Sequence, residues 1–245
     1  MHFSMPEREH VGGMAAFLTL RRMNTILRDS VERGKEVAMA TKTITVPLPD
    51  DHAEPAWEVA LLFPAQGEWS EDDYLWLTDH TRCLVEFTDG HIEVLPMPTD
   101  AHQRIVLFLY RALYAFLAAR ALGIVLVAPL RLRLRTGRYR EPDLLLLLST
   151  DDPRRRNRYW TGADLVLEVV SPDDPKRDLV RKRREYARAG IPEYWIVNPA
   201  TEQILVLRLA GTAYVEHGVF TRGTQATSVL LAGFTVAVAA VLDAE

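Results

Sequence analysis

The chain has 245 residues, of which 48% are apolar, with 29 Lys and Arg against 33 Asp and Glu. This composition is typical of a soluble globular protein with one substantial core. A single cysteine, Cys83, excludes a disulfide framework and a cysteine-rich zinc site, and it favours a reducing, cytoplasmic location. No apolar run reaches the roughly 20 residues of a membrane-spanning helix, so we expect no membrane partner.

The chain divides by composition near residue 70. Residues 1–69 are expected to form an N-terminal extension, partly disordered or loop, because a proline-rich and acidic stretch runs from Pro47 to Trp69. Residues 70–245 are expected to form one folded domain.

Sequence patterns predict the elements of this domain in order. They are a helix over 71–78, a hairpin over 83–96, a helix over 101–122, strands over 123–135, 142–149 and 163–172, a helix over 176–190, and strands over 193–199 and 203–209. Ser70 followed by Asp73 predicts a capping box for the first helix, and Asp89-Gly90 predicts the hairpin turn. We therefore predict a mixed α/β fold with a central mixed sheet flanked by helices, an N-terminal hairpin and extra C-terminal strands.

The ends and faces of two elements are also predicted. Thr99 or Asp100 is expected to cap the helix over 101–122, and Gly123 to end it. Strict alternation from Leu130 to Arg135 predicts a continued strand with three leucines on one face and three arginines on the other.

Charge is distributed unevenly along the chain. Thr43–Leu130 holds 4 basic and 13 acidic residues, whereas Arg131–Arg184 holds 15 basic and 9 acidic residues. The net charge of −4 gives no indication of a nucleic-acid partner. Basic runs are usually solvated surface, but the position of these runs around the acids described next favours contact with a phosphate backbone.

Glu168 interrupts the apolar run of a predicted central strand, Leu165–Val170. Because an unpaired carboxylate is costly to bury, a compensating cation is expected. Either an arginine forms a salt bridge with Glu168, or a divalent metal ion binds it.

Asp143 follows Pro142 at the start of the preceding apolar strand. An acid at this position is usually a turn residue. Adjacent strands of one sheet, however, can bring Asp143 and Glu168 close enough to share a hard cation. Oxygen ligands without clustered Cys or His favour Mg²⁺ or Mn²⁺ over zinc.

Asp178, Lys182 and Tyr186 are spaced by four and therefore share one face of the predicted helix. A lysine beside a reacting phosphate stabilises the charge that develops there. The alternative is a solvated helix with a routine ion pair between Asp178 and Lys182.

Five segments carry a resemblance to a known family. They are "VEFTDGHIEVLPMP", "HQRI", "REPDLLLLL", "LVLEVVSP" and "RDLVRKRREYARAGIPEYWIVNP". In this order they resemble the Uma-type family of restriction endonucleases, part of the PD-(D/E)xK nuclease superfamily, from about Ser70 to the C-terminus. The resemblance implies a restriction-endonuclease-like core of helix, three strands, helix and strand, which is also the order predicted above.

The resemblance implies roles for several residues. Asp143 and Glu168 would be the metal-binding acids. The superfamily pattern places a lysine two residues after the second acid, where this chain has Val170, and Lys182 matches the helical lysine thought to replace it in this family. Glu86 matches an acid before the tight turn that either assists the metal or pairs with an arginine.

His102 and Gln103 lie at the start of the long helix. They point either towards the site or towards the phosphate, and for His102 a capping or packing role is the alternative.

The resulting hypothesis is a Mg²⁺- or Mn²⁺-dependent endonuclease that hydrolyses duplex DNA. The metal polarises the phosphate and acidifies a bound water, while Lys182 orients that water or stabilises the transition state. A homodimer is expected because cutting two strands needs two sites.

Two rival hypotheses remain. One is a catalytically inactive nucleic-acid-binding or regulatory protein with the nuclease fold, favoured by Val170 and the negative net charge. The other is an oligomeric interaction module that uses the apolar C-terminal tail from Val229 to Leu242.

Overall fold

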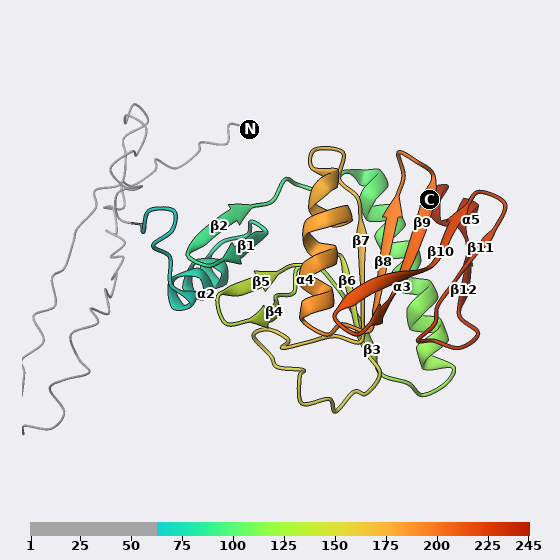
Figure 1. Ribbon diagram of the computed structural model, residues 1–245, viewed down its shortest axis with the longest axis horizontal. Coiled ribbons are helices and arrows are strands. Elements are labelled where there is room, and N and C mark those ends of the chain that lie inside the picture. Colours follow the sequence, from blue (N-terminus) through green and yellow to red (C-terminus); the bar gives the residue numbers. More distant parts are fainter. Residues whose placement is uncertain (1–62) are drawn as a thin grey trace, which may run out of the picture. The chain divides into compact units, whose positions relative to one another are not determined.

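A six-stranded mixed sheet organises residues 63–245, the part of the chain that the computed structural model describes (Figure 1). Its order is β10-β9-β8-β7-β6-β3. The strands are β3 (Ile124–Val127), β6 (Leu144–Leu147), β7 (Leu165–Val169), β8 (Glu193–Asn198), β9 (Gln203–Ala210) and β10 (Ala213–Thr221). β7 and β8 are parallel and all other neighbours are antiparallel. This confirms the predicted mixed α/β fold.

Most of the extension expected over residues 1–69 lies outside the described residues. The compact unit described below comprises Pro64–Glu245. Within the described range, no helix is long and apolar enough to cross a bilayer.

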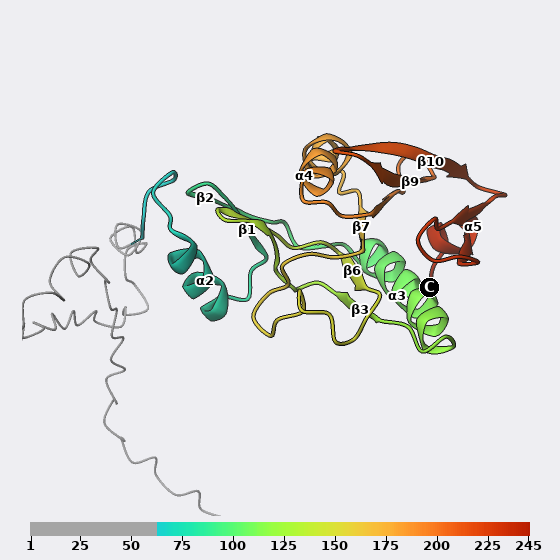
Figure 2. The ribbon, with the colours of Figure 1, turned by 60° about the horizontal axis from the view of Figure 1, so that its bottom comes forward.

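Helices cover both faces of the six-stranded sheet (Figure 2). α3 (Asp100–Ala118) and α5 (Val238–Leu242) pack on one face. The continuous segment of η2 (Arg177–Lys182) and α4 (Arg183–Arg188) connects β7 to β8 and packs on the other face. Each face therefore has its own hydrophobic core.

Alternation along β7 decides which core each side chain enters. Leu165, Leu167 and Val169 lie in the core under α3, whereas Val166 and Val170 lie in the core under α4. Glu168 stands between the last two in this pattern, so its carboxylate faces η2 and α4.

A second sheet has the order β2-β1-β5-β4 and packs with α2 (Glu71–His80). Its strands are β1 (Val85–Thr88), β2 (His91–Val94), β4 (Leu132–Arg135) and β5 (Arg138–Arg140). Tyr74 from α2 lies 5.2 Å from the Phe87 ring and 5.1 Å from the Tyr139 ring, measured between centroids. These aromatic contacts build a third, smaller core.

The local signals at the start of the domain are confirmed. Ser70 and Asp73 form the reciprocal capping box at the start of α2. Asp89 and Gly90 both have positive φ in the turn between β1 and β2. Thr99 is the residue that caps α3, since its side chain accepts from the His102 amide.

The long helix ends earlier than predicted, at Ala118 instead of Leu122. The chain must turn back so that β3 can pair with β6. Gly123 takes φ +34°, and a Cβ there would lie 1.9 Å from the Leu147 carbonyl oxygen. The position of β6 therefore explains both the glycine and the early end of the helix.

The single strand predicted over 123–135 is wrong. The extended segment is interrupted near Pro129, so that two separate strands form. β3 joins the large sheet and β4 joins the small one. The arginine face of β4 and the residue before it is paired with acids from the first half of the domain. The pairs are Arg131 with Asp79 at 2.6 Å, Arg133 with Glu71 at 2.9 Å and Arg135 with Asp89 at 2.7 Å. These arginines stabilise the small sheet and are not free for phosphate.

The C-terminal tail packs inward. β11 (Gln225–Thr227) pairs with β12 (Thr235–Ala237), and α5 follows directly. Val236, Val238 and Val241 are buried in the core that contains α3. The tail therefore contributes to this core.

Glu193 holds the tail to the large sheet. This buried carboxylate on β8 accepts hydrogen bonds from the Trp195 indole, the Ser228 hydroxyl and the amides of Val229 and Leu230, at 2.6 to 2.8 Å. Its four donors make it a structural residue.

The Glu193→Ala substitution should destabilise the protein by about 3–5 kcal/mol, because it leaves these donors without an acceptor. Chemical denaturation followed by circular dichroism measures the change. Glu202→Ala is the matched control, since Glu202 forms an exposed ion pair with Arg222 at 2.7 Å and the loss of such a pair should have a much smaller effect. Equal effects of the two substitutions would contradict the structural role of Glu193.

Candidate functional site

Asp143 and Glu168 meet because of the register between β6 and β7. The two strands are antiparallel with Leu144 opposite Leu167, so Asp143, one residue before β6, falls opposite Glu168. Residues opposed in this way have Cβ atoms about 5 Å apart. The Asp143 Oδ2 atom also accepts a hydrogen bond from the Val169 amide at 2.7 Å, which fixes the side chain at the end of β7.

Glu168 receives two donors from the segment that packs on its face of the sheet. Lys182 Nζ lies 2.9 Å from Glu168 Oε1, and the Tyr186 hydroxyl donates to the same oxygen at 2.6 Å. The partner expected from burial is therefore a lysine, not one of the arginines. Glu168 Oε2 and Asp143 Oδ1 accept no hydrogen bond within the described part of the chain.

Lys182 is buried among three carboxylates. Besides Glu168, its Nζ atom lies 3.3 Å from Glu86 Oε1 and 3.3 Å from Asp178 Oδ1. Burial alone would lower the pKa of Lys182, but the charges of these acids outweigh it and raise the pKa. Lys182 is thus an ammonium ion, and the prediction that Asp178, Lys182 and Tyr186 share one helical face agrees with the geometry.

The segment that carries these residues begins as a π-helix over Arg177–Lys182 and continues as α-helix. Single π-helical turns inside helices occur frequently at functional sites. The wider turn affects the placement of Asp178 and Lys182, which the sequence pattern treated as regular α-helix.

Two carboxyl groups of the acid cluster have raised pKa values. Burial, together with the charges of Asp178 and Asp143, raises the pKa of Glu168 to about 8 against the opposing charge of Lys182. Burial also raises the pKa of Asp178. Two acids with raised pKa values beside one ammonium ion indicate a site that would gain stability from an additional cation.

Glu86 pairs with a lysine and with an arginine. The arginine pair is one of the two alternatives predicted for Glu86, although the sequence did not identify Arg140 as the partner. Arg140 on β5 is buried, with its Nε atom 3.5 Å from Glu86 Oε2 and a bidentate contact to Glu185 at 2.7 and 2.8 Å. Burial would raise the pKa of Glu86, but Lys182 and Arg140 hold it below its usual value. The signal in the sequence was the short alternation Arg138, Tyr139, Arg140 after Gly137.

His102 contacts the first acid. Its Nε2 atom lies 3.2 Å from Asp143 Oδ2. Burial would lower the pKa of His102, but Asp143 raises it. Gln103 is exposed, and its side chain forms no hydrogen bond within the described residues. The structure therefore brings His102 to the site and leaves Gln103 at the surface.

The site opens to solvent at Asp143. The side chains of Asp143 and His102 are 18% and 17% exposed, whereas those of Glu168 and Lys182 are 4% and 3% exposed. In residues 63–245 no three His, Cys, Asp or Glu side chains are arranged to hold a metal ion. Mg²⁺ is usually held by only one or two carboxylates, with waters and substrate phosphates completing its shell. The free oxygens of Asp143 and Glu168 fit that requirement.

Val170 cannot contribute to this chemistry. Its side chain is buried in the core under α4 and its amide donates to the Val197 carbonyl. Lys182 is instead the ammonium group that reaches Glu168.

Comparison with known proteins identifies the family. The sequence profile of the Uma2 family, described as "Putative restriction endonuclease", matches residues 71–239. The chain belongs to the Uma2 family. No curated protein matches the sequence.

A solved structure has the same fold as this Uma2 protein. It is the crystal structure of "a putative nuclease belonging to DUF820" from Anabaena variabilis ATCC 29413, with a TM-score of 0.59 and 18% sequence identity. The likeness covers 71% of this chain and 97% of that chain. At this identity it shows the fold alone, which is restriction-endonuclease-like. The Uma2 family supports a nuclease and hence a nucleic-acid substrate.

Glu141 is a further buried acid beside the Uma2 site. Its side chain is 7% exposed on a residue basis, and its Oε2 atom has no hydrogen-bond partner. Burial raises the pKa of Glu141 from 4.5 to about 7, and the charge of Glu86 adds to the effect. The ionised form is therefore disfavoured in the folded protein.

Stability should fall as the pH rises from about 4.5 to 7, because the unfolded chain loses the Glu141 proton first. Glu141→Gln should flatten this part of the profile and stabilise the metal-free protein at pH 8 by up to about 3 kcal/mol. Urea denaturation at several pH values measures this. Glu216→Gln, at an exposed position, is the control. An unchanged profile for Glu141→Gln would contradict the raised pKa.

Proposed function

We propose that this Uma2 protein is a Mg²⁺- or Mn²⁺-dependent endonuclease that hydrolyses the phosphodiester bonds of duplex DNA. The observation that supports it most is the buried arrangement of Glu168 with Lys182 and Tyr186, opposite Asp143. A buried carboxylate opposite a partly exposed one, with unused oxygens and an adjacent ammonium ion, supplies the groups that phosphodiester hydrolysis needs.

Asp143 and Glu168 would hold the metal, since each keeps one carboxylate oxygen that accepts no hydrogen bond from the described residues. When bound, the divalent ion supplies Lewis-acid polarisation of the phosphate and a more acidic water. His102 positions Asp143, and Tyr186 positions Glu168.

Lys182 would act as a cation and hydrogen-bond donor. Its raised pKa keeps it protonated, so it cannot take a proton from the attacking water. It can orient that water or stabilise the negative charge that develops on the phosphate. Glu86 and Asp178 hold the ammonium group in place and are positioning residues.

Cutting both strands of duplex DNA requires two sites, so we expect a homodimer or two successive binding events. A cytoplasmic location is also expected from the single cysteine.

The rival function is a nucleic-acid-binding protein of the same fold without turnover. Val170 favours it, because the usual lysine position of the superfamily is occupied by a side chain packed in the core. Binding that persists without cleavage under all conditions would support this rival.

Purified protein should cut plasmid DNA when Mg²⁺ or Mn²⁺ is added. Asp143→Asn and Glu168→Gln should each lower the rate at least about 100-fold and should remove the increase in melting temperature caused by Mn²⁺. Gel assays and thermal unfolding measure the two effects. Asp173→Asn, an exposed acid in the loop after β7, should change neither. If the wild-type protein cuts neither duplex, branched nor single-stranded DNA, the proposed endonuclease activity is wrong.

The Tyr186→Phe substitution tests whether the reaction requires the ionised form of Glu168. The Tyr186 hydroxyl lowers the pKa of Glu168, so its removal should raise that pKa and shift the rising limb of the rate profile to higher pH. Tyr214→Phe is the control, because the Tyr214 hydroxyl is also buried but donates to the Ile191 carbonyl. A uniform loss of rate at all pH values would indicate a purely structural role for the Tyr186 hydroxyl.

A further inference from the structure

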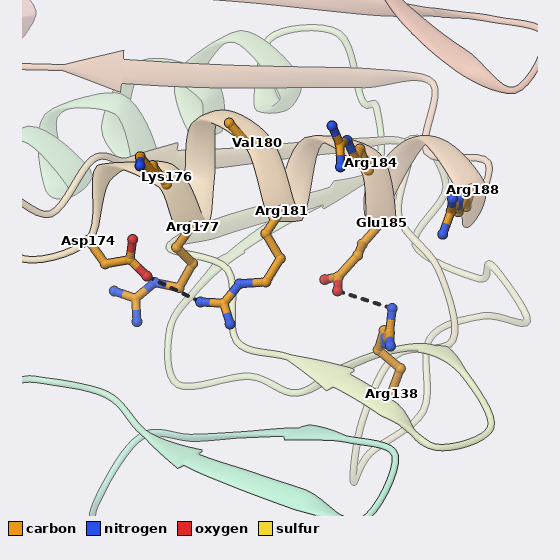
Figure 3. Close-up of a pocket in the computed structure, with 9 residues that line it drawn as sticks. All are labelled: Arg138, Asp174, Lys176, Arg177, Val180, Arg181, Arg184, Glu185 and Arg188. Atoms are coloured by element: carbon orange, nitrogen blue, oxygen red, sulfur yellow. Dashed lines mark hydrogen bonds and ion pairs between the residues drawn. The ribbon is translucent and has the colours of Figure 1, made fainter.

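A basic groove lies along the segment η2–α4 (Figure 3). The same segment carries Asp178 and Lys182 of the acid cluster. It has a volume of about 440 Å³. Six of its lining residues are basic and two are acidic, which leaves four positive charges in excess. The basic residues are Arg138, Lys176, Arg177, Arg181, Arg184 and Arg188. Val180 is the only apolar side chain in the lining.

Some of these cations are already paired. Arg177 and Arg181 each contact Glu93, at 3.3 and 3.2 Å, and Arg138 contacts Glu185 at 3.1 Å. In Figure 3 Arg177 and Arg181 extend to the same side of the helix as Glu185. These pairs shape one wall of the groove and contribute little to its net charge.

The other three cations have no acidic partner. Lys176, Arg184 and Arg188 are exposed, and no carboxylate of the described residues lies within 4.0 Å of their charged groups. Arg184 and Arg188 are spaced by four on one helix, where like charges repel each other. A bound anion would relieve this repulsion. The unpaired cations and their mutual repulsion therefore both favour binding of a polyanion.

The dimensions of the groove fit a nucleic-acid strand. Twelve residues separate Lys176 from Arg188, which corresponds to roughly 18 Å along a helix. One strand of B-DNA carries a phosphate about every 3.4 Å along its axis, so the three cations extend over about five phosphates. Asp178 and Lys182, on the same segment, point into the acid cluster.

We propose that this groove binds backbone phosphates along one strand of the nucleic acid that the site acts on, with Lys176, Arg184 and Arg188 as the contacts. The identity of the strand as substrate rests on the proposed function, whereas the binding does not. An anionic membrane fits less well, because surfaces that bind membranes combine cations with several exposed apolar side chains and this lining offers Val180 alone.

Binding can be measured without catalysis. We would titrate the full-length protein into a fluorescein-labelled DNA duplex of about 20 base pairs in EDTA, and follow anisotropy at several salt concentrations. Arg184→Glu with Arg188→Glu should weaken binding about ten-fold or more and reduce the salt slope by about 2, since each lost phosphate contact contributes about 0.9. Arg184→Gln with Arg188→Gln should give a smaller loss in the same direction.

The matched control is Arg111→Glu. Arg111 is exposed on α3 and has no acidic partner among the described residues, but α3 covers the opposite face of the sheet. It should leave affinity and slope unchanged. Thermal unfolding should be the same for all variants, because every substituted side chain is exposed.

The outcomes separate the two proposals. If both Arg184/Arg188 double variants bind DNA as the wild type does, the proposal that the groove binds DNA is wrong. The proposed endonuclease function is unaffected by this result if plasmid is still cut. Groove-dependent binding without any cleavage supports the groove and overturns the endonuclease. If the wild-type protein does not bind the DNA duplex, the groove is not a nucleic-acid contact. The same conclusion follows if the double variants bind DNA normally and lose only the binding to phosphatidylglycerol vesicles, measured in parallel.

Discussion

The buried contact between Lys182 and Glu168 is the constraint on which the site depends. It joins the segment that crosses from β7 to β8 with the centre of the large sheet. Removing one partner of a buried pair leaves an uncompensated charge, at a cost of about 3–5 kcal/mol. The helix therefore cannot shift along the sheet without breaking the pair, and this also fixes Asp178 and Tyr186 around Glu168.

The uneven charge along the chain is used mainly inside the molecule. Acids of α2 and of the first hairpin pair with arginines of the small sheet, as in the contacts of Asp79 with Arg131 and Asp89 with Arg135. The exposed surface is consequently much less basic than the local count of arginines suggests. The cations that stay unpaired in the groove, such as Arg184 and Arg188, belong to the one helix that also carries Lys182.

Two buried carboxylates on neighbouring strands differ in their hydrogen-bond partners. Glu193 on β8 has both oxygens occupied by neutral donors, including two backbone amides, and it closes the fold. Glu168 on β7 receives both of its donors on one oxygen and keeps the other available. The partners, and not burial, thus distinguish a saturated carboxylate from one with a free oxygen, because burial is nearly the same at both positions.

The sequence by itself determined the features that depend on neighbours along the chain. The capping box at Ser70, the turn at Asp89-Gly90, the mixed α/β order and the anomaly of an acid within Leu165–Val170 could all be read locally. Asp143 followed from its pairing with Glu168 on a neighbouring strand, and the family resemblance added Lys182. Each of these follows from short-range periodicity or from a motif.

Only the tertiary structure decided how distant segments meet. It divided residues 123–135 between two sheets, paired the arginines of β4 with α2 and the first hairpin, and placed Arg140 beside Glu86. The register between β6 and β7, which sets Asp143 opposite Glu168, depends on strand pairing across many intervening residues. Such contacts follow from burial and charge compensation in three dimensions, which no local pattern of residues encodes.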